Sequence, residues 1–207
     1  MIKSAKKLRR ELESAARLDP GLRKLLNALG CPAPRARPPG FETLLRTIVS
    51  QQLSTGAAAA IWRKLEKSCR GRVTHRKIRN RNDAQLRACG LSAQKIGYAR
   101  GLANMVAARE INLDALAKME SEAVIAELVR VRGIGRWSAE IYAMFALGRA
   151  DIFPAGDLAL QVAVGRYLSL PERPGAKQTA ALAERWSPHR SSVALLMWKY
   201  YGAATLD

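Results

Sequence analysis

The stretch LVRVRGIGRWSA, Leu128–Ala139, decides the fold of this 207-residue chain. Within it a helix is expected to end, two glycines bracket Ile134, and a new helix begins at once. Glycine permits tight backbone geometry and lets another backbone approach closely. The N–H groups of such a turn lie at a helix N-terminus, where an anion such as a phosphate is favoured. The stretch therefore predicts a helical hairpin that can bind the backbone of a nucleic acid.

The side chains around the turn, residues 132–136, support this interpretation. Two arginines flank it with positive charge, a nearby serine adds a hydroxyl donor, and the isoleucine between the glycines is expected to point inward as an anchor. The predicted DNA-binding set is Arg132, Gly133, Ile134, Gly135, Arg136 and Ser138. The competing interpretation is a plain corner between two helices, because many such turns contain glycine.

The charge of the chain points to the same class of partner. Lysine and arginine total 35 against 17 acidic residues, which gives a formal net charge of +18. An excess of this size favours a polyanion, since lysine and arginine contacts release counterions from a nucleic-acid backbone. A merely soluble basic protein, or a surface for anionic lipid, would also be basic. Charge thus indicates a class of partner and no activity.

Cysteine usage and hydropathy suggest where the chain works. Cys31, Cys69 and Cys89 are odd in number and widely spaced, so they fit neither a disulfide framework nor a CxxC metal site. No apolar run approaches membrane-spanning length, and no signal-peptide core follows the first residues. We expect a soluble protein of the bacterial cytoplasm, associated with the nucleoid, that binds no membrane.

Helical patterns dominate the rest of the chain, and no convincing strand ladder is present. Residues 41–49 carry apolar side chains at the spacing of an amphipathic helix, and Ser54 or Thr55 can cap the next helix. Near the C-terminus, Ser187 and Pro188 are typical of an N-cap followed by proline at the first helical position. The sequence predicts an all-α protein of roughly ten helices joined by short connections.

Further segments match the hairpin to a known family. The chain resembles the helix-hairpin-helix DNA glycosylase superfamily, in which a Gly/Pro-rich loop and a catalytic aspartate follow the hairpin. The matching segments, which span residues 41 to about 201, are Phe41–Ser54, Gly90–Ala99, Ile152–Gln161 and Arg185–Ser191 together with Trp198. The branch that it is most similar to is the bacterial 3-methyladenine DNA glycosylase II type in a short form, without the N-terminal β domain of larger members.

The resemblance implies two helical lobes with the active-site cleft between them. All of residues 1–207 would form one glycosylase unit. Residues 41–150 would be a six-helix lobe that contains the hairpin, and residues 1–40 with 151–207 would be the second helical lobe, which carries Asp157.

Asp157 is the catalytic carboxylate that the resemblance implies. Cleavage of an N-glycosidic bond builds positive charge on the sugar, and a fixed carboxylate stabilises that charge. A base that is already cationic leaves without a general acid, and neither His75 nor His189 lies in a recognisable acid–base pattern. The competing interpretation is a helix N-cap, since Asp157 follows Gly156 and opens a helical stretch. Many relatives carry a polar or acidic residue where Gly156 stands.

The resemblance also separates two mechanisms. Bifunctional relatives have a lysine after the hairpin arginine, which forms a Schiff base and then cuts the strand. This chain has Trp137 there. No cysteine follows Cys89, so the four-cysteine iron–sulfur cluster of some relatives is absent. We expect a monofunctional enzyme that uses no cofactor and leaves an abasic site.

The base pocket and the DNA wedge follow from the same resemblance. Trp137, Trp198 and Ile141 match pocket positions, where aromatic faces would hold a cationic base; core packing is the alternative for both tryptophans. Ile141, with Tyr142 beside it, replaces a further aromatic, and His189 replaces a second tryptophan of many relatives. Both departures leave the range of substrates open.

Flipping a base out of the duplex leaves a gap that a side chain must fill. Gln52 is the predicted wedge and Leu53 the second candidate; a plain helix-turn residue is the alternative for Gln52. Relatives often bind a monovalent cation through hairpin carbonyls, here those of Val129, Val131 and Gly133.

The expected substrate is double-stranded DNA with alkylated bases of the 3-methyladenine and 7-methylguanine type. The protein would act as a monomer without an obligate protein partner. Two alternatives stay open: a non-catalytic helix-hairpin-helix DNA-binding module, and a glycosylase for deaminated, etheno or oxidised bases.

Overall fold

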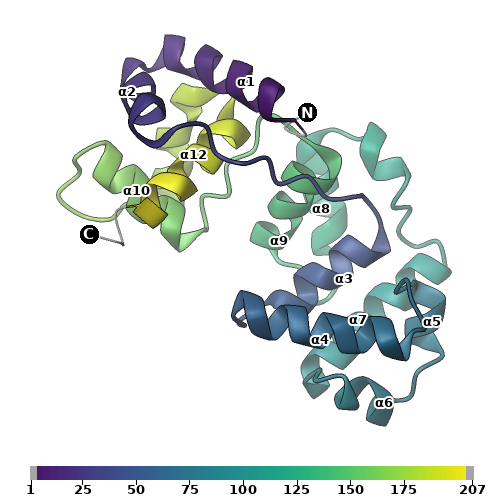
Figure 1. Ribbon diagram of the computed structural model, residues 1–207. Helices are drawn as coiled ribbons and strands as arrows, with labels where there is room; N and C mark the ends of the chain where they lie inside the picture. Colours follow the sequence, from purple (N-terminus) through teal and green to yellow (C-terminus); the bar gives the residue numbers. More distant parts are fainter. Residues whose placement is uncertain (1–3, 204–207) are drawn as a thin grey trace. The chain divides into compact units, whose positions relative to one another are not determined.

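The computed structural model describes residues 4–203 as a set of helices, with no strand in that range (Figure 1). This confirms the predicted all-α class. Residues 1–3 and 204–207, which the sequence analysis assigned to the second lobe, lie outside the described range. The chain divides into two compact units. One consists of Met1–Ala36 and Ala143–Asp207, and the other of Arg37–Tyr142.

The continuous unit holds the hairpin. Its helices are α3 (Phe41–Ser50), α4 (Thr55–Ser68), α5 (His75–Arg79), α6 (Asp83–Ala88), α7 (Ala93–Ala107), the 3-10 helix η1 (Ala115–Lys118), α8 (Ser121–Val129) and α9 (Arg136–Tyr142). It thus has seven α-helices, whereas the lobe predicted for residues 41–150 has six. The unit begins at Arg37 and ends at Tyr142, so it is shorter at its C-terminal end than the predicted 41–150.

Helix α3 is the centre of this unit and packs against α4, α7 and α9. The apolar side chains of its predicted pattern are buried, and Leu44, Leu45 and Ile48 have no exposed surface. Side-chain caps start the neighbouring helices: Ser54 accepts from the Ala57 N–H, and Asn82 forms a capping box with Gln85. Of the two alternatives that the sequence left open for α4, Ser54 or Thr55, the cap is thus Ser54.

The discontinuous unit is made from both ends of the chain. Its helices are α1 (Ala5–Leu18), α2 (Pro20–Leu29), the π-helix η2 (Ala143–Leu147), α10 (Leu158–Tyr167), α11 (Ala176–Ala183), the 3-10 helix η3 (Glu184–Trp186) and α12 (Arg190–Ala203). Helix α12 packs against α1, α2 and α10.

Asp19 ties the N-terminal helices to the rest of that unit. Its side chain caps α2 through the Gly21 N–H and also accepts from the Tyr167 hydroxyl (2.7 Å) and from Trp186 Nε1 (2.8 Å). Trp186 has no exposed surface. One carboxylate therefore holds together segments from the two ends of the chain.

One local prediction was wrong. Helix α12 begins at Arg190, so Ser187 and Pro188 do not start it; the peptide bond between them is cis, and the Ser187 hydroxyl donates instead to Asp151 (2.8 Å). The helix after the hairpin, α9, ends at Tyr142, and the chain continues as the π-helix η2.

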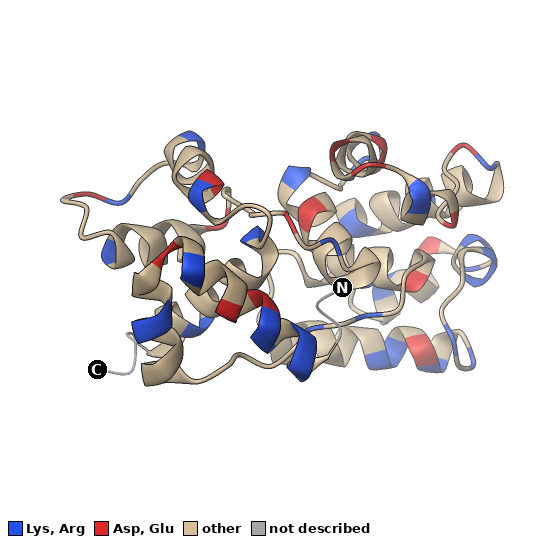
Figure 2. Ribbon diagram, turned by 90° about the horizontal axis from the view of Figure 1, so that it is seen from above, with Lys and Arg blue, Asp and Glu red and all other residues tan. Residues whose placement is uncertain are grey.

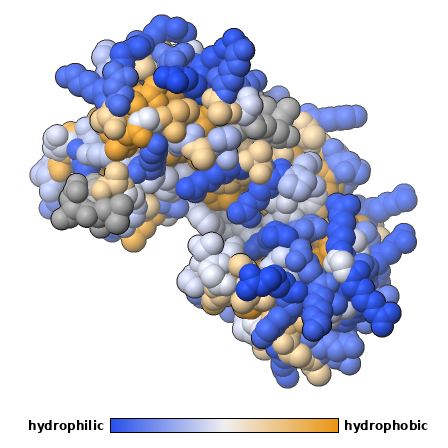
Figure 3. All heavy atoms as spheres, viewed as in Figure 1, coloured by the Kyte–Doolittle hydropathy of each residue, from blue (hydrophilic) through white to orange (hydrophobic). Residues whose placement is uncertain are grey.

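Lysine and arginine recur along the helices of both units (Figure 2). On the face that Figure 3 draws, hydrophilic residues cover most of the surface around α4 and α5. None of the helices among residues 4–203 has the length and apolarity that crossing a membrane requires.

Candidate functional site

The hairpin is fixed by backbone geometry and by one buried anchor. Ile134 is 3% exposed, as expected for an inward-pointing residue. Gly133 has a φ of +92°, which L side chains rarely adopt, and a Cβ atom there would overlap the ring of Tyr98. Gly135 has neither constraint, since no atom lies within 4 Å of a Cβ placed on it. Only the first of the two glycines is therefore demanded by the fold.

A hollow of about 710 Å³ lies beside the hairpin. Three segments of the continuous unit line it: the turn after α3, the first part of α7, and the hairpin itself. The residues are Ser50, Gln51, Gln52, Gln94, Lys95, Tyr98, Val129, Val131, Arg132, Gly133, Ile134, Gly135, Trp137 and Ser138. The predicted DNA-binding hairpin and the predicted wedge thus share one concave surface.

The two hairpin arginines differ in what surrounds them. Arg132 is exposed, and no ion pair is recorded for it among residues 4–203. The guanidinium of Arg136 is instead paired with Glu122 (2.8 Å) and Glu140 (3.0 Å). The Arg136 side chain is nevertheless 61% exposed, so it still lies at the surface beside the turn.

Glu140 is a buried carboxylate behind the hairpin, on α9. Burial raises its pKa to about 7, against the opposing attraction and hydrogen bond of Arg136. Ser138, expected to be an accessible donor, is only 4% exposed, and its Oγ lies 3.4 Å from Gln51 Nε2.

The turn that joins α3 to α4 presents the two wedge candidates. Gln52 is exposed and has a φ of +55°, the left-handed region that few residues other than glycine adopt. Leu53 is 39% exposed, which is unusual for a large apolar side chain of this chain. Both wedge candidates therefore lie on the surface of the turn.

The residue before them, Gln51, is half-buried and bonds to the hairpin. Its Nε2 donates to the carbonyl oxygen of Gly133 in the hairpin (2.8 Å). From α7, Lys95 Nζ donates to the carbonyls of Val49 and Gln51, both at 2.7 Å, and burial lowers the pKa of this lysine. These contacts fix the turn from two directions.

The cation set taken from the resemblance fits only in part. The carbonyl of Gly133 accepts from Gln51, and that of Val131 accepts from the Ile134 N–H (2.9 Å). The Gly133 carbonyl, one of the three expected ligands of a monovalent cation, thus already accepts a hydrogen bond from the protein. Among residues 4–203 no three histidine, cysteine or acidic side chains are grouped as metal ligands.

Asp157 lies at the start of α10 in the discontinuous unit. It is the N-cap of that helix: its Oδ1 accepts from the Leu160 N–H (3.1 Å). The same oxygen accepts from Nε1 of Trp198 on α12 (3.1 Å). The capping interpretation is thereby confirmed, and it leaves the carboxylate half-buried and fixed between two helices.

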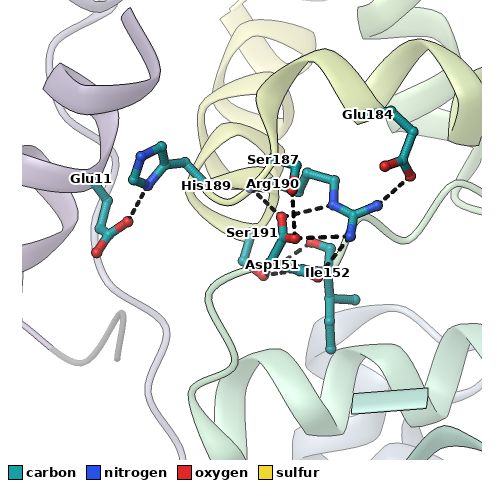
Figure 4. A network of polar contacts seen from close by, with 8 residues as sticks. All are labelled: Glu11, Asp151, Ile152, Glu184, Ser187, His189, Arg190 and Ser191. Atoms are coloured by element: carbon teal, nitrogen blue, oxygen red, sulfur yellow. Dashed lines mark hydrogen bonds and ion pairs between the residues drawn. The ribbon is translucent and has the colours of Figure 1, made fainter. Parts of the chain in front are cut away.

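The loop that leads to Asp157 is clamped onto the start of α12 by a polar network (Figure 4). Asp151 receives two guanidinium bonds from Arg190, at 2.7 and 2.9 Å. The Ser191 hydroxyl accepts from the Ile152 N–H and donates to the Ile152 carbonyl, both at 3.0 Å. Burial raises the pKa of Asp151, but the bonds from Arg190 and Ser187 lower it by more, so the net shift is downward.

Two further contacts complete this network. Arg190 also pairs with Glu184 on η3, and His189 Nδ1 contacts a Glu11 carboxylate oxygen on α1 (Figure 4). His189, which replaces a tryptophan of many relatives, therefore has a partner from the N-terminal helix.

The predicted pocket residues fall into the two units. Trp137 and Ile141 lie one turn apart on α9 in the continuous unit, and Trp137 is 40% exposed. Trp198 lies on α12 of the discontinuous unit, where its ring is 6.0 Å from that of Phe145 and 5.7 Å from the Arg35 guanidinium. The other two tryptophans are core residues: Trp62 is 4% exposed and Trp186 is fully buried.

Sequence reasoning missed the residues that hold these groups in place: Gln51, Lys95, Tyr98, Asp151 and Arg190. Four of them lie in segments that were recognised: Phe41–Ser54 contains the first, Gly90–Ala99 the next two and Arg185–Ser191 the last, whereas Asp151 lies just before Ile152–Gln161. The individual roles were not, because they depend on partners distant in the sequence, such as Gly133 for Gln51.

Comparison with known proteins identifies the family of the chain. The model of the HhH-GPD superfamily of base excision DNA repair proteins matches residues 45–189. The chain is 34% identical to the DNA-3-methyladenine glycosylase 1 of Schizosaccharomyces pombe over 163 residues, 77% of this chain and 71% of that one.

Two solved structures are similar over nearly the whole chain, each at 30% identity. The DNA-3-methyladenine glycosidase of Bacillus halodurans has a TM-score of 0.85, with 95% of this chain and 91% of that one covered. The 3-methyladenine DNA glycosylase of S. pombe, solved in complex with abasic DNA, has a TM-score of 0.82, with 92% and 95% covered. With the family model matched over residues 45–189 and these relatives at 30% identity or more, this chain belongs to the HhH-GPD superfamily of base excision DNA repair proteins.

Proposed function

We propose that this protein is a DNA glycosylase that hydrolyses the N-glycosidic bond of alkylated bases, of the 3-methyladenine and 7-methylguanine type. The observation that carries the proposal is the carboxylate of Asp157, fixed by the Leu160 and Trp198 N–H groups. The relatives named for 3-methyladenine support the class of substrate.

Asp157 would act by electrostatic stabilisation. As the base departs, positive charge grows on the sugar, and a carboxylate that is already oriented stabilises that charge without reorganisation. A methylated purine that carries a positive charge leaves as a neutral base, so no general acid is required. A site that has a carboxylate but no assigned general acid therefore favours alkylated bases over oxidised ones.

The target base would reach Asp157 by leaving the DNA stack. We assign Gln52 as the side chain that enters the vacated space, with Leu53 beside it, because both are exposed on the fixed turn. The amide of Gln52 can hydrogen-bond to the orphaned partner base, which the leucine side chain cannot do.

DNA would be held through the hairpin, with its backbone N–H groups and Arg132 facing a phosphate. Trp137, Ile141 and Trp198 would contact the extruded base, and the tryptophan faces suit a cation. Because Trp137 stands where a Schiff-base lysine would be needed, the product would be an intact strand with an abasic site. We propose that a monomer acts without a partner protein, on the DNA of a bacterial cell.

The direct test is release of bases from methylated duplex DNA by the purified protein. We expect release of 3-methyladenine and 7-methylguanine without strand cleavage. In parallel, oligonucleotides with hypoxanthine, ethenoadenine or 8-oxoguanine measure the range of substrates. A preparation that binds DNA but releases none of these bases would show a non-catalytic DNA-binding module instead.

Asp157→Asn tests the catalytic assignment in the same assay. Asparagine is as good an N-cap as aspartate, so folding and DNA binding should be retained. Excision should fall by about 10²–10³-fold. Asp114→Asn, at an exposed position before η1, is the matched control and should excise like the wild type. Wild-type turnover by Asp157→Asn would refute the assignment.

A further inference from the structure

The turn after α3 is attached to the hairpin by a single side chain. Gln51 Nε2 donates to the Gly133 carbonyl at 2.8 Å, and it lies 3.4 Å from the Ser138 hydroxyl oxygen. The bond joins residues 82 positions apart in the sequence. It connects the segment that carries the wedge candidates to the segment that is expected to hold the DNA backbone.

The same turn is also fixed at its own backbone. Lys95 Nζ bonds to the carbonyls of Val49 and Gln51, at the C-terminal end of α3, where carbonyl groups lack helical partners. The backbone at Gln52 is left-handed, and its side chain is exposed. Of the two adjacent glutamines, Gln51 is thus half-buried and bound to the hairpin, and Gln52 is exposed to solvent.

Gly133 is equally constrained on its other side. Its φ of +92° and the ring of Tyr98 leave the peptide little freedom, so its carbonyl is a fixed acceptor. A fixed acceptor at one end and a fixed turn at the other make the Gln51 side chain a rigid link.

We propose that Gln51 is a positioning residue that sets the wedge turn relative to the DNA-binding hairpin, so that the grip of the hairpin on the backbone determines how far the wedge enters the duplex. The inference rests on the proposed glycosylase function and deepens it. Gln51 itself touches neither the substrate base nor Asp157 in this assignment.

The proposal predicts where a defect will be seen. Opening a well-paired base costs unpairing and unstacking energy, whereas a base without a partner has already lost much of that interaction. A misplaced wedge should therefore slow excision from a fully paired duplex and matter little when the damaged base lies opposite an abasic site. A general loss of folding or of catalysis would affect both substrates alike.

The test uses Gln51→Glu and Gln51→Met, which keep the length of the side chain but remove the N–H donor. Single-turnover release of a methylated base is measured from duplexes with a normal partner and with an abasic site opposite the lesion. DNA affinity and thermal unfolding are measured on the same preparations. Gln178→Met, at an exposed position on α11, is the control for a Gln→Met exchange.

We expect both variants to lose on the order of 10²-fold in rate on the paired duplex, as for a misplaced group elsewhere in an active site. On the unpaired lesion they should approach the wild-type rate, with DNA affinity retained. An equal loss on both substrates, or unchanged rates on both, would overturn the inference. If one variant fails to fold, the other decides the question. A wild-type protein that releases no base from either duplex would overturn the proposed function itself.

Discussion

The hairpin and the loop before Asp157 hold their functional groups in different ways. The hairpin depends on backbone conformation and apolar packing: a left-handed glycine, a tyrosine ring against it, and the buried Ile134. The loop depends on polar side chains, with Asp151 bound to Arg190 and Asp157 bound to Trp198. A backbone-built site should tolerate most side-chain exchanges except at its glycine, whereas a side-chain-built site should respond to the loss of a single donor.

Substitution of Glu140 should give the largest effect that contradicts this comparison, since Glu140 is a polar side chain buried behind the backbone-built hairpin. Its pKa is raised by burial to about 7, so the folded protein binds this proton more tightly than the unfolded chain. Its contribution to stability is therefore fully present below the unfolded carboxyl pKa and is lost as the pH rises towards 7.

We expect Glu140→Gln to gain stability relative to the wild type by roughly 3 kcal/mol over that pH range. The measurement is the free energy of urea unfolding of both proteins across the range, taken as a difference so that other titrating groups cancel. Glu120→Gln, at an exposed position before α8, should show no such trend. A difference that is independent of pH would show that folding leaves the pKa of Glu140 unchanged.

The unfolding free energies of Gly133→Ala and Gly135→Ala can be compared to test the role of backbone conformation within the hairpin itself. The alanine at position 133 must adopt a positive φ and displace the Tyr98 ring, which should cost about 1–3 kcal/mol in unfolding free energy. At position 135 the Cβ meets open space, and the change should stay within about 0.5 kcal/mol. Equal costs at the two positions, from chemical denaturation, would mean that Tyr98 moves freely.

Trp198→Phe makes the smallest change in the side-chain-built site. It keeps an aromatic ring but removes the N–H that bonds to Asp157. Loss of one such bond should raise the barrier by about 1 kcal/mol, a roughly fivefold slower single-turnover excision. Trp62→Phe removes a similar bond, to Glu66, in the other unit and should leave the rate unchanged. If Trp198→Phe also excises at the wild-type rate, the orientation of Asp157 does not depend on this bond.

Much of the fold followed from local patterns. The apolar spacing of α3, the first glycine of the hairpin and the capping side chain of Ser54 act over a few residues, and the structure agrees with these three. The start of α12 was misjudged because Ser187 is bound to Asp151, a partner 36 residues away that no local pattern reveals.

The candidate site divides in the same way. The resemblance pointed to Asp157 and to the turn at Gln52, and the structure has a helix cap at the first position and an exposed turn at the second. The two ion pairs of Arg136 were not predicted. One partner, Glu122, lies on the preceding helix, and the other, Glu140, becomes buried only on folding. Charge in a sequence indicates how many cations exist, and packing determines which of them remain available.

The bonds of Asp19 have a consequence for the order in which the protein can form during its synthesis. Its two side-chain partners, Tyr167 and Trp186, are 148 and 167 residues further along the chain. Residues 37–142 are continuous and can fold as they leave the ribosome. Helices α1 and α2 are translated first but cannot complete their packing until the last helix has emerged. The helices that are translated first are thus among the last to complete their packing.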